Sequence, residues 1–144
     1  NNKLLARILK LIGVPTGAKV FKKFYIPNWI LQDKKLFASF INRLFSCEGC
    51  IDLNNKYIEI QMYKSLDILE NGVEFFKCIK LYLLKYFDIK TTNPFLGNIN
   101  TRKDKRKTRA IRIKIKNKDS LIKFQKYIDF DDINKKERLT QIIK

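Results

Sequence analysis

Residues 46–50 read Ser-Cys-Glu-Gly-Cys and end an apolar segment with helical spacing. A carboxylate at this point is unusual, because negative charge at the C-terminal end of a helix is disfavoured by about 0.3–1 kcal/mol. Glu48 and Gly49 therefore allow two interpretations. They form an ordinary helix stop, or Glu48 is held at the helix end to do chemistry.

The cysteines beside this acid suggest a second kind of chemistry. Cys47 and Cys50 have CxxC spacing, but the chain has no histidine and its third cysteine is Cys78. A four-ligand zinc site would therefore need Glu48 or a second chain. We expect the thiols to pack as small apolar side chains instead. Their odd number argues against a disulfide framework and favours a reducing compartment, the cytoplasm.

The charge balance indicates a polyanionic partner. The 144 residues, which suit one ordinary domain, include 31 Lys and Arg against 14 Asp and Glu, for a formal net charge of +17. Nucleic acid is the commonest partner of such a chain, although a solubilising surface or a protein-interaction domain would carry the same charge. Basic residues are densest at 101–109, which forms a solvated loop tip or a grip on phosphate. No apolar stretch reaches the ~20 residues of a membrane span.

Hydrophobic periodicity places these residues on an α+β framework. Apolar residues at helical spacing predict helices at residues 2–12, 34–47, 66–87 and 120–128, and after residue 132. Period-two alternation predicts two hairpins, at residues 51–63 with a turn at 54–56, and at residues 94–116. The resulting order is α, α, ββ, α, ββ, α, α. Antiparallel strand pairs with helices on one side give this α+β pattern.

Smaller sequence signals locate the helix ends and the packing of the connector at residues 14–31. Asp33 and Ser65 are suitable N-caps for the helices that follow them. Gly72 should slightly weaken the helix in which it lies. Trp29 and Ile30, after Pro27, should pack onto the core.

Four segments in this order resemble the LAGLIDADG homing endonuclease family. They are IPNWI at 26–30, FINRLFSCEG at 40–49, the helical segment at 63–89, and LIKFQKYIDFDDINKKERL at 121–139. The resemblance covers nearly the whole chain. It implies an αββαββα saddle at residues 34–144, preceded by an extra N-terminal helix and connector at residues 1–33.

The resemblance also implies an activity: Mg²⁺-dependent, site-specific cleavage of both strands of DNA by an enzyme encoded in an intron or intein, or free-standing. Glu48 falls on the family's metal-binding acid, and the Cys47 carbonyl falls on the neighbouring main-chain ligand. Lys114 corresponds to a basic residue near the scissile phosphate, where it would polarise water or stabilise the transition state. The alternative role for Lys114 is one more contact to the DNA backbone.

Double-stranded DNA is the partner that the resemblance implies, with strand residues in the major groove. The residues expected to contact bases or the waters near them are Asn54, Tyr57, Glu59, Gln61, Tyr63, Arg112 and Lys116. An ordinary solvated sheet face would also explain Glu59. The residues expected to bind phosphate are Arg102, Lys103, Lys105, Arg106, Lys107 and Arg109.

The signature helix is expected to pack against the same helix of a second half through Ser39, Asn42, Arg43 and Ser46. The chain has one signature motif, so the second half is another copy in a homodimer or another part of a longer protein. Residues 1–30 resemble the lead-in to a second motif, which favours the longer protein. Arg43 replaces a glycine that allows close helix approach. A DNA- or intron-RNA-binding module without cleavage, acting as a regulator or splicing maturase, is therefore the alternative function.

Overall fold

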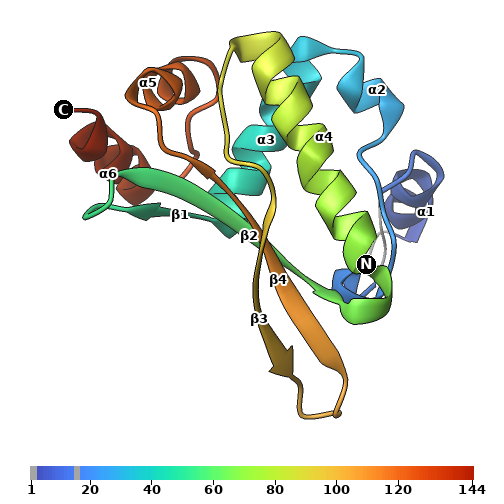
Figure 1. Ribbon diagram of the computed structural model, residues 1–144. Helices are drawn as coiled ribbons and strands as arrows, with labels where there is room; N and C mark the ends of the chain where they lie inside the picture. Colours follow the sequence, from blue (N-terminus) through green and yellow to red (C-terminus); the bar gives the residue numbers. More distant parts are fainter. Residues whose placement is uncertain (1–2, 15–16) are drawn as a thin grey trace.

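The computed structural model describes residues 3–14 and 17–144, and it has the predicted α+β class. A four-stranded antiparallel sheet has the order β1-β2-β4-β3. Its strands are β1 (Gly49–Asp52), β2 (Tyr57–Ser65), β3 (Phe95–Thr101) and β4 (Lys107–Ile115). The larger helices gather on one side of this sheet (Figure 1). They are α3 (Lys34–Glu48), α4 (Leu69–Phe87), α5 (Lys118–Tyr127) and α6 (Ile133–Ile143).

The core lies between these helices and the aliphatic face of the sheet. Alternation along β2 and β4 turns every second side chain toward the helices. Isoleucines from the strands and phenylalanines from the helices and the segment after α5 fill this layer. The most deeply buried are Ile58, Ile60, Ile111, Ile113, Ile115, Phe37, Phe45, Phe76, Phe124 and Phe130.

Helix α3 begins and ends as its sequence requires. Asp33 caps its N-terminus by accepting hydrogen bonds from the backbone N–H groups of Lys35 and Leu36, which confirms the predicted cap. At the other end the chain passes from Glu48 directly into β1. Gly49 has an extended backbone with φ −79°, and an added Cβ would lie 2.6 Å from the Phe45 carbonyl oxygen. Glycine is therefore needed here for the absence of a side chain rather than for a left-handed conformation.

The start of helix α4 corrects one smaller prediction, and its packing explains why a glycine occurs within it. Ser65 is the last residue of β2 and makes no side-chain cap, because a 3₁₀ turn, η2 (Leu66–Ile68), comes between the strand and the helix. Gly72 is buried where the helix crosses the sheet, and an added Cβ would lie 2.3 Å from Ile111 Cδ1. Gly72 thus permits close helix–sheet packing, which outweighs its weak helix propensity.

The N-terminal segment consists of α1 (Lys3–Leu11), a 3₁₀ turn, η1 (Lys19–Phe21), and α2 (Asn28–Leu31). Ile30 is buried as predicted, but Trp29 is half exposed and its indole N–H donates to the Ile12 carbonyl. Two buried side chains anchor the connector. Lys64 Nζ donates to the carbonyls of Lys19 and Lys22 at 2.8 and 2.5 Å. Asn71 hydrogen-bonds to both the backbone N–H and the carbonyl of Phe24, each at 3.1 Å.

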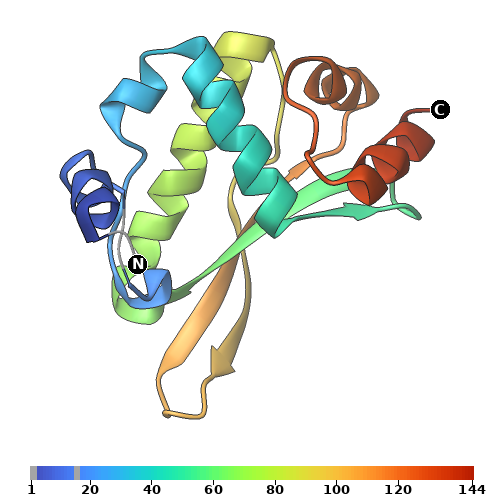
Figure 2. The ribbon, with the colours of Figure 1, turned by 180° about the vertical axis from the view of Figure 1, so that it is seen from behind.

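The β3–β4 hairpin extends beyond the helices, as both ribbon views show (Figure 2). Its connecting turn is closed by a hydrogen bond from the Arg102 N–H to the Arg106 carbonyl. Lys107 and Arg109 lie within β4 rather than in the loop, so the predicted loop was too long. Within the described ranges, no helix has the length and apolar character needed to cross a bilayer.

Candidate nucleic-acid interface

The second face of the sheet has no helix over it in the described part of the chain (Figures 1 and 2). The polar and aromatic side chains of β2 and β4 alternate onto this face. Strand alternation places the residues on this face. Glu59 lies opposite Lys114, Gln61 opposite Arg112, and Tyr63 opposite Ala110 in the β2–β4 register. The candidate contacts on β2 and β4 are therefore brought together on one surface.

Glu59 lies at the centre of this face and is 8% exposed. Its Oε2 is 3.0 Å from Lys114 Nζ, and its Oε1 is 3.6 Å from Arg112 Nη1. Strand pairing explains the geometry, because Lys114 is the direct cross-strand neighbour and Arg112 the diagonal one. Glu59 is therefore enclosed by two cations, which is neither the solvated position nor the free base contact that its sequence position suggested.

Lys114 is held from three directions. Its backbone pairs with β2 on one side, and on the other its N–H donates to Thr92 Oγ1 at 3.0 Å. Its ammonium group lies 3.8 Å from the centre of the Tyr57 ring. Burial acts to lower the pKa of Lys114, but hydrogen bonds to Tyr57 and Glu59 outweigh it and raise the pKa above its usual value. Lys114 is thus a fixed cation, suited to stabilising negative charge rather than to removing a proton.

The Gln61–Arg112 pair leaves hydrogen-bonding capacity unused. Gln61 Oε1 and Arg112 Nε are buried, and neither has a hydrogen-bond partner among the described residues. One atom is an acceptor and the other a donor, and they come from directly opposed residues. A buried polar atom without a partner costs about 1–3 kcal/mol, so an outward turn of either side chain that brings its atom to a partner is favoured.

Glu48 ends α3 with its side chain exposed. In the part of the chain that the structure describes, it makes no hydrogen bond or ion pair. The nearby helix end is stabilised by a residue that the sequence did not indicate. Lys135 Nζ from α6 lies 2.6 Å from the Ser46 carbonyl oxygen and 3.5 Å from that of Phe45. This cation offsets the negative end of the helix dipole close to Glu48.

The cysteines of the CxxC pair do not pack as predicted. Cys47 and Cys50 are both exposed free thiols, whereas Cys78 is half buried against the core. Cys50 lies opposite Glu59 in the β1–β2 register. Although Cys50 is exposed, partial burial of its thiol raises the pKa, with a further contribution from the Glu59 charge. No group of three or more potential metal-binding side chains occurs in the described residues.

The four residues expected at a helix-pair interface divide between two faces of α3. Asn42 Nδ2 donates to the carbonyls of Ile128 and Asp129, and Ser46 Oγ accepts from the backbone N–H of Asp131. These two side chains are used to fix the α5–α6 connection within the chain. Ser39 and Arg43 are exposed, and Arg43 Nη1 lies 3.6 Å from Asp131 Oδ2.

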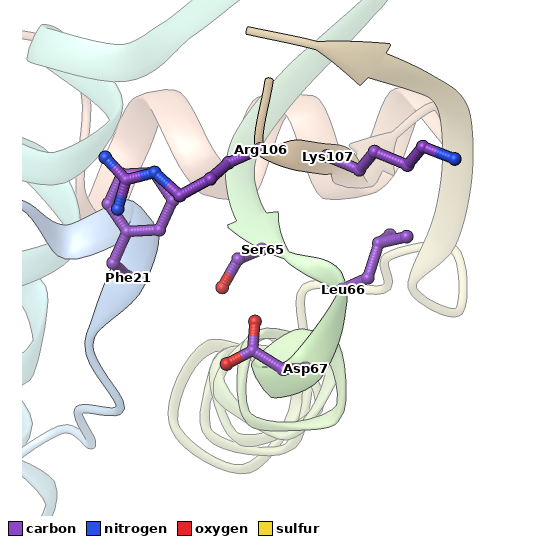
Figure 3. Close-up of a pocket in the computed structure, with 6 residues that line it drawn as sticks. All are labelled: Phe21, Ser65, Leu66, Asp67, Arg106 and Lys107. Carbon is purple, nitrogen blue, oxygen red and sulfur yellow. The ribbon is translucent and has the colours of Figure 1, made fainter. Parts of the chain in front are cut away.

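The basic hairpin tip is exposed to solvent, and two of its arginines pair with Asp104. Arg106 forks onto Asp104, with Nη2 at 2.6 Å and Nε at 2.9 Å from Oδ2, and its guanidinium carbon lies 3.5 Å from the centre of the Phe21 ring. Figure 3 shows this stack at one side of a hollow of about 420 Å³ that also includes Ser65 and Asp67. Arg102 lies 3.8 Å from Asp104 as well.

The remaining predicted DNA contacts differ in their freedom. Arg109 Nε donates to the Gly97 carbonyl at 2.7 Å, so it braces the hairpin. Tyr57 and Tyr63 are half buried on the helix-free face. Exposed positions at the ends of the strands and in their turns are Asn54, Lys103, Lys105, Lys107 and Lys116.

Comparisons with protein-family models, with curated proteins and with solved structures find no match to this chain.

Proposed function

We propose that the chain is one half of a site-specific, Mg²⁺-dependent DNA endonuclease of the LAGLIDADG type, with a saddle-shaped sheet that lies across double-stranded DNA. The observation that carries the proposal is the helix-free face of the sheet, where Gln61, Arg112 and Lys114 are held by strand pairing. A two-stranded β-ribbon, such as the β2–β4 pair, fits the major groove. The net charge of +17 supplies the sequence-independent attraction to phosphate.

Glu48 supports a catalytic role because its carboxylate is exposed and has no partner among the described residues. The chain provides one carboxylate at this point, so the second carboxylate would have to come from the corresponding helix of a second half, packed against α3. Mg²⁺ accepts such oxygen ligands together with water, and when bound it would activate water and stabilise charge on the departing oxygen. The Cys47 carbonyl is the proposed main-chain ligand. Lys114 would provide a fixed positive charge for the phosphate.

The helix pairing on which this proposal depends would use the exposed side of α3. Ser39, Arg43 and Cys47 are spaced four residues apart on this side, and all three are exposed. Arg43 leans toward Asp131, which moves its long side chain in the direction of the α5–α6 connection. This displacement reduces the obstacle that Arg43 presents to a second helix.

Arg43 also supports a second candidate function, a DNA- or intron-RNA-binding module that does not cleave. Its side chain is 74% exposed on the surface where the two helices would meet. An arginine there prevents the close backbone approach that a glycine allows. Such a module would keep the sheet surface and its sequence preference.

A two-stage experiment separates these functions. Duplexes selected from a random-sequence library by binding would first be sequenced, and the selected site would then be placed in a plasmid and incubated with Mg²⁺. We expect cutting by the wild type, loss of cutting in Glu48→Gln, and normal cutting in Glu74→Gln, which removes an exposed carboxylate from α4. Selected binding without cutting would identify the binding module. Binding without any sequence preference would reject both functions.

A further inference from the structure

We propose that Glu59 determines the sequence preference of the helix-free face by fixing Arg112 and Lys114, and that Arg112 and its neighbour Gln61 read a G·C base pair while Lys114 faces the phosphate. This inference rests on the proposed DNA-binding function. It assigns Glu59 a positioning role, because the carboxylate is enclosed by two cations and does not itself reach the DNA.

The placement of Glu59 within a basic face requires an explanation. A carboxylate under a DNA-binding surface opposes the phosphates and weakens binding to every sequence. Here its two oxygens face two different cations, at 3.0 Å for Lys114 and 3.6 Å for Arg112. Long basic side chains otherwise sample many rotamers, and ordering them before binding reduces the entropy lost on contact. Glu59 thus lowers the affinity for DNA of every sequence but holds the donor groups of Arg112 and Lys114 in defined positions.

The donors fixed by Glu59 suit guanine. In the major groove, guanine presents two acceptors, N7 and O6, and its partner cytosine presents an N4 donor. The Arg112 side chain is 35% exposed, so its guanidinium can reach a base edge while Glu59 holds it. Lys114 adds a second cation on the same face.

Two atoms of the Gln61–Arg112 pair that lack hydrogen-bond partners also suit a G·C base pair. Arg112 Nε is a donor and Gln61 Oε1 an acceptor, and both are buried without a partner in the described part of the chain. Once the two side chains turn outward, a G·C edge, directly or through a bridging water, offers acceptors to Arg112 and a donor to Gln61. An A·T edge would place the adenine N6 donor against the two cations instead.

The test compares binding-site preferences of wild type and Glu59→Gln by sequencing duplexes selected from a random library. In the wild type we expect one G·C pair to be preferred over the alternatives by about tenfold or more. In Glu59→Gln that preference should fall to within about twofold, while affinity for unrelated DNA rises by about threefold at low salt. A purely structural role would lower all binding together. Glu74→Gln makes the same change of charge on α4 and should leave every position unchanged.

Arg112→Lys provides a second route, because it keeps the charge but loses the planar fork, and it tests the inference if Glu59→Gln does not fold. Arg112→Lys should remove the base preference at the same base-pair position. The role of Glu59 would be overturned if both variants kept the base preferences of the wild type. It would also be overturned if the two variants lost their preference at different base-pair positions. A wild type without any selected site would instead overturn the proposed function, and this inference with it.

Discussion

Replacing Gly49 by alanine should destabilise the protein at the junction that places Glu48 beside the sheet. The added Cβ would lie 2.6 Å from the Phe45 carbonyl oxygen and 3.3 Å from the Phe45 carbonyl carbon. These are backbone atoms of the last turn of α3, so they cannot rotate away as a side chain would. Relief requires a shift of the helix end or of the pairing between Gly49 and Ile60.

The size of the effect follows from two opposing contributions. Forcing atoms into a packed site costs about 1–3 kcal/mol. The backbone at Gly49, with φ −79° and ψ 149°, is accessible to alanine, so the loss of freedom in the unfolded chain returns about 0.4–1 kcal/mol. Because the clash is with backbone, we expect the upper part of the first range and a net loss of about 2 kcal/mol.

Urea denaturation followed by far-ultraviolet circular dichroism would measure this loss. Gly97→Ala is the matched control, because its Cβ would lie 3.2 Å from the Ala110 methyl group on the protruding hairpin. Its effect should stay below about 1 kcal/mol. A Gly49→Ala variant as stable as the wild type would refute the reasoning that glycine is required for steric space.

Two further predictions concern titration and DNA binding. Burial lowers the pKa of Lys64 to about 8 from 10.5, so between these values the unfolded chain holds a proton that the folded chain has released. The free energy of unfolding should therefore rise with pH in this window, by at most about 3 kcal/mol. The control is Lys64→Met, which has no group that titrates at this position. Equal pH profiles for the two proteins would contradict the prediction. Arg112→Ala should cost roughly 1–3 kcal/mol at one base position, and Lys105→Ala should weaken binding to all sequences and flatten the salt slope by about one. Equal losses on every sequence in Arg112→Ala, measured by titrating matched and mismatched duplexes, would reject base reading by that residue.

The elements of the fold could be predicted because their signals are local. Period-two alternation in residues 57–63 and 110–115 defines both long strands and their polar faces. Asp33 caps a helix two and three residues away, and such a contact depends only on the neighbouring backbone. Alternation along the strands therefore predicted which side chains share a face of the sheet.

The parts that escaped prediction depend on contacts between distant segments. Gly72 looked like a weak helix position, and its role became clear only when α4 was seen to cross Ile111. Lys64 would continue the aliphatic face of β2 by alternation, yet its ammonium is buried against carbonyls 42 and 45 residues away. Lys135 binds a carbonyl 89 residues distant.

In the candidate site, too, local signals were predictable from the sequence and contacts between distant segments were not. Strand alternation gave the face on which Glu59 lies, but it could not show that neighbouring cations would enclose the carboxylate. The resemblance of α3 to the LAGLIDADG signature helix implied that Asn42 and Ser46 face a second helix. The structure uses them to hold the α5–α6 connection, and the sequence contained no local signal of that packing.

The most direct test of the account is a lysine acetylation footprint of the protein with and without duplex DNA at low salt, read by mass spectrometry. We expect DNA to protect Lys105, at the tip of the protruding hairpin, and Lys116, directly after β4. Lys77 and Lys85, on α4 at the opposite side of the sheet, should be acetylated equally in both samples. Protection of Lys77 and Lys85 with unchanged acetylation of the sheet lysines would contradict the claim that DNA lies on the helix-free face.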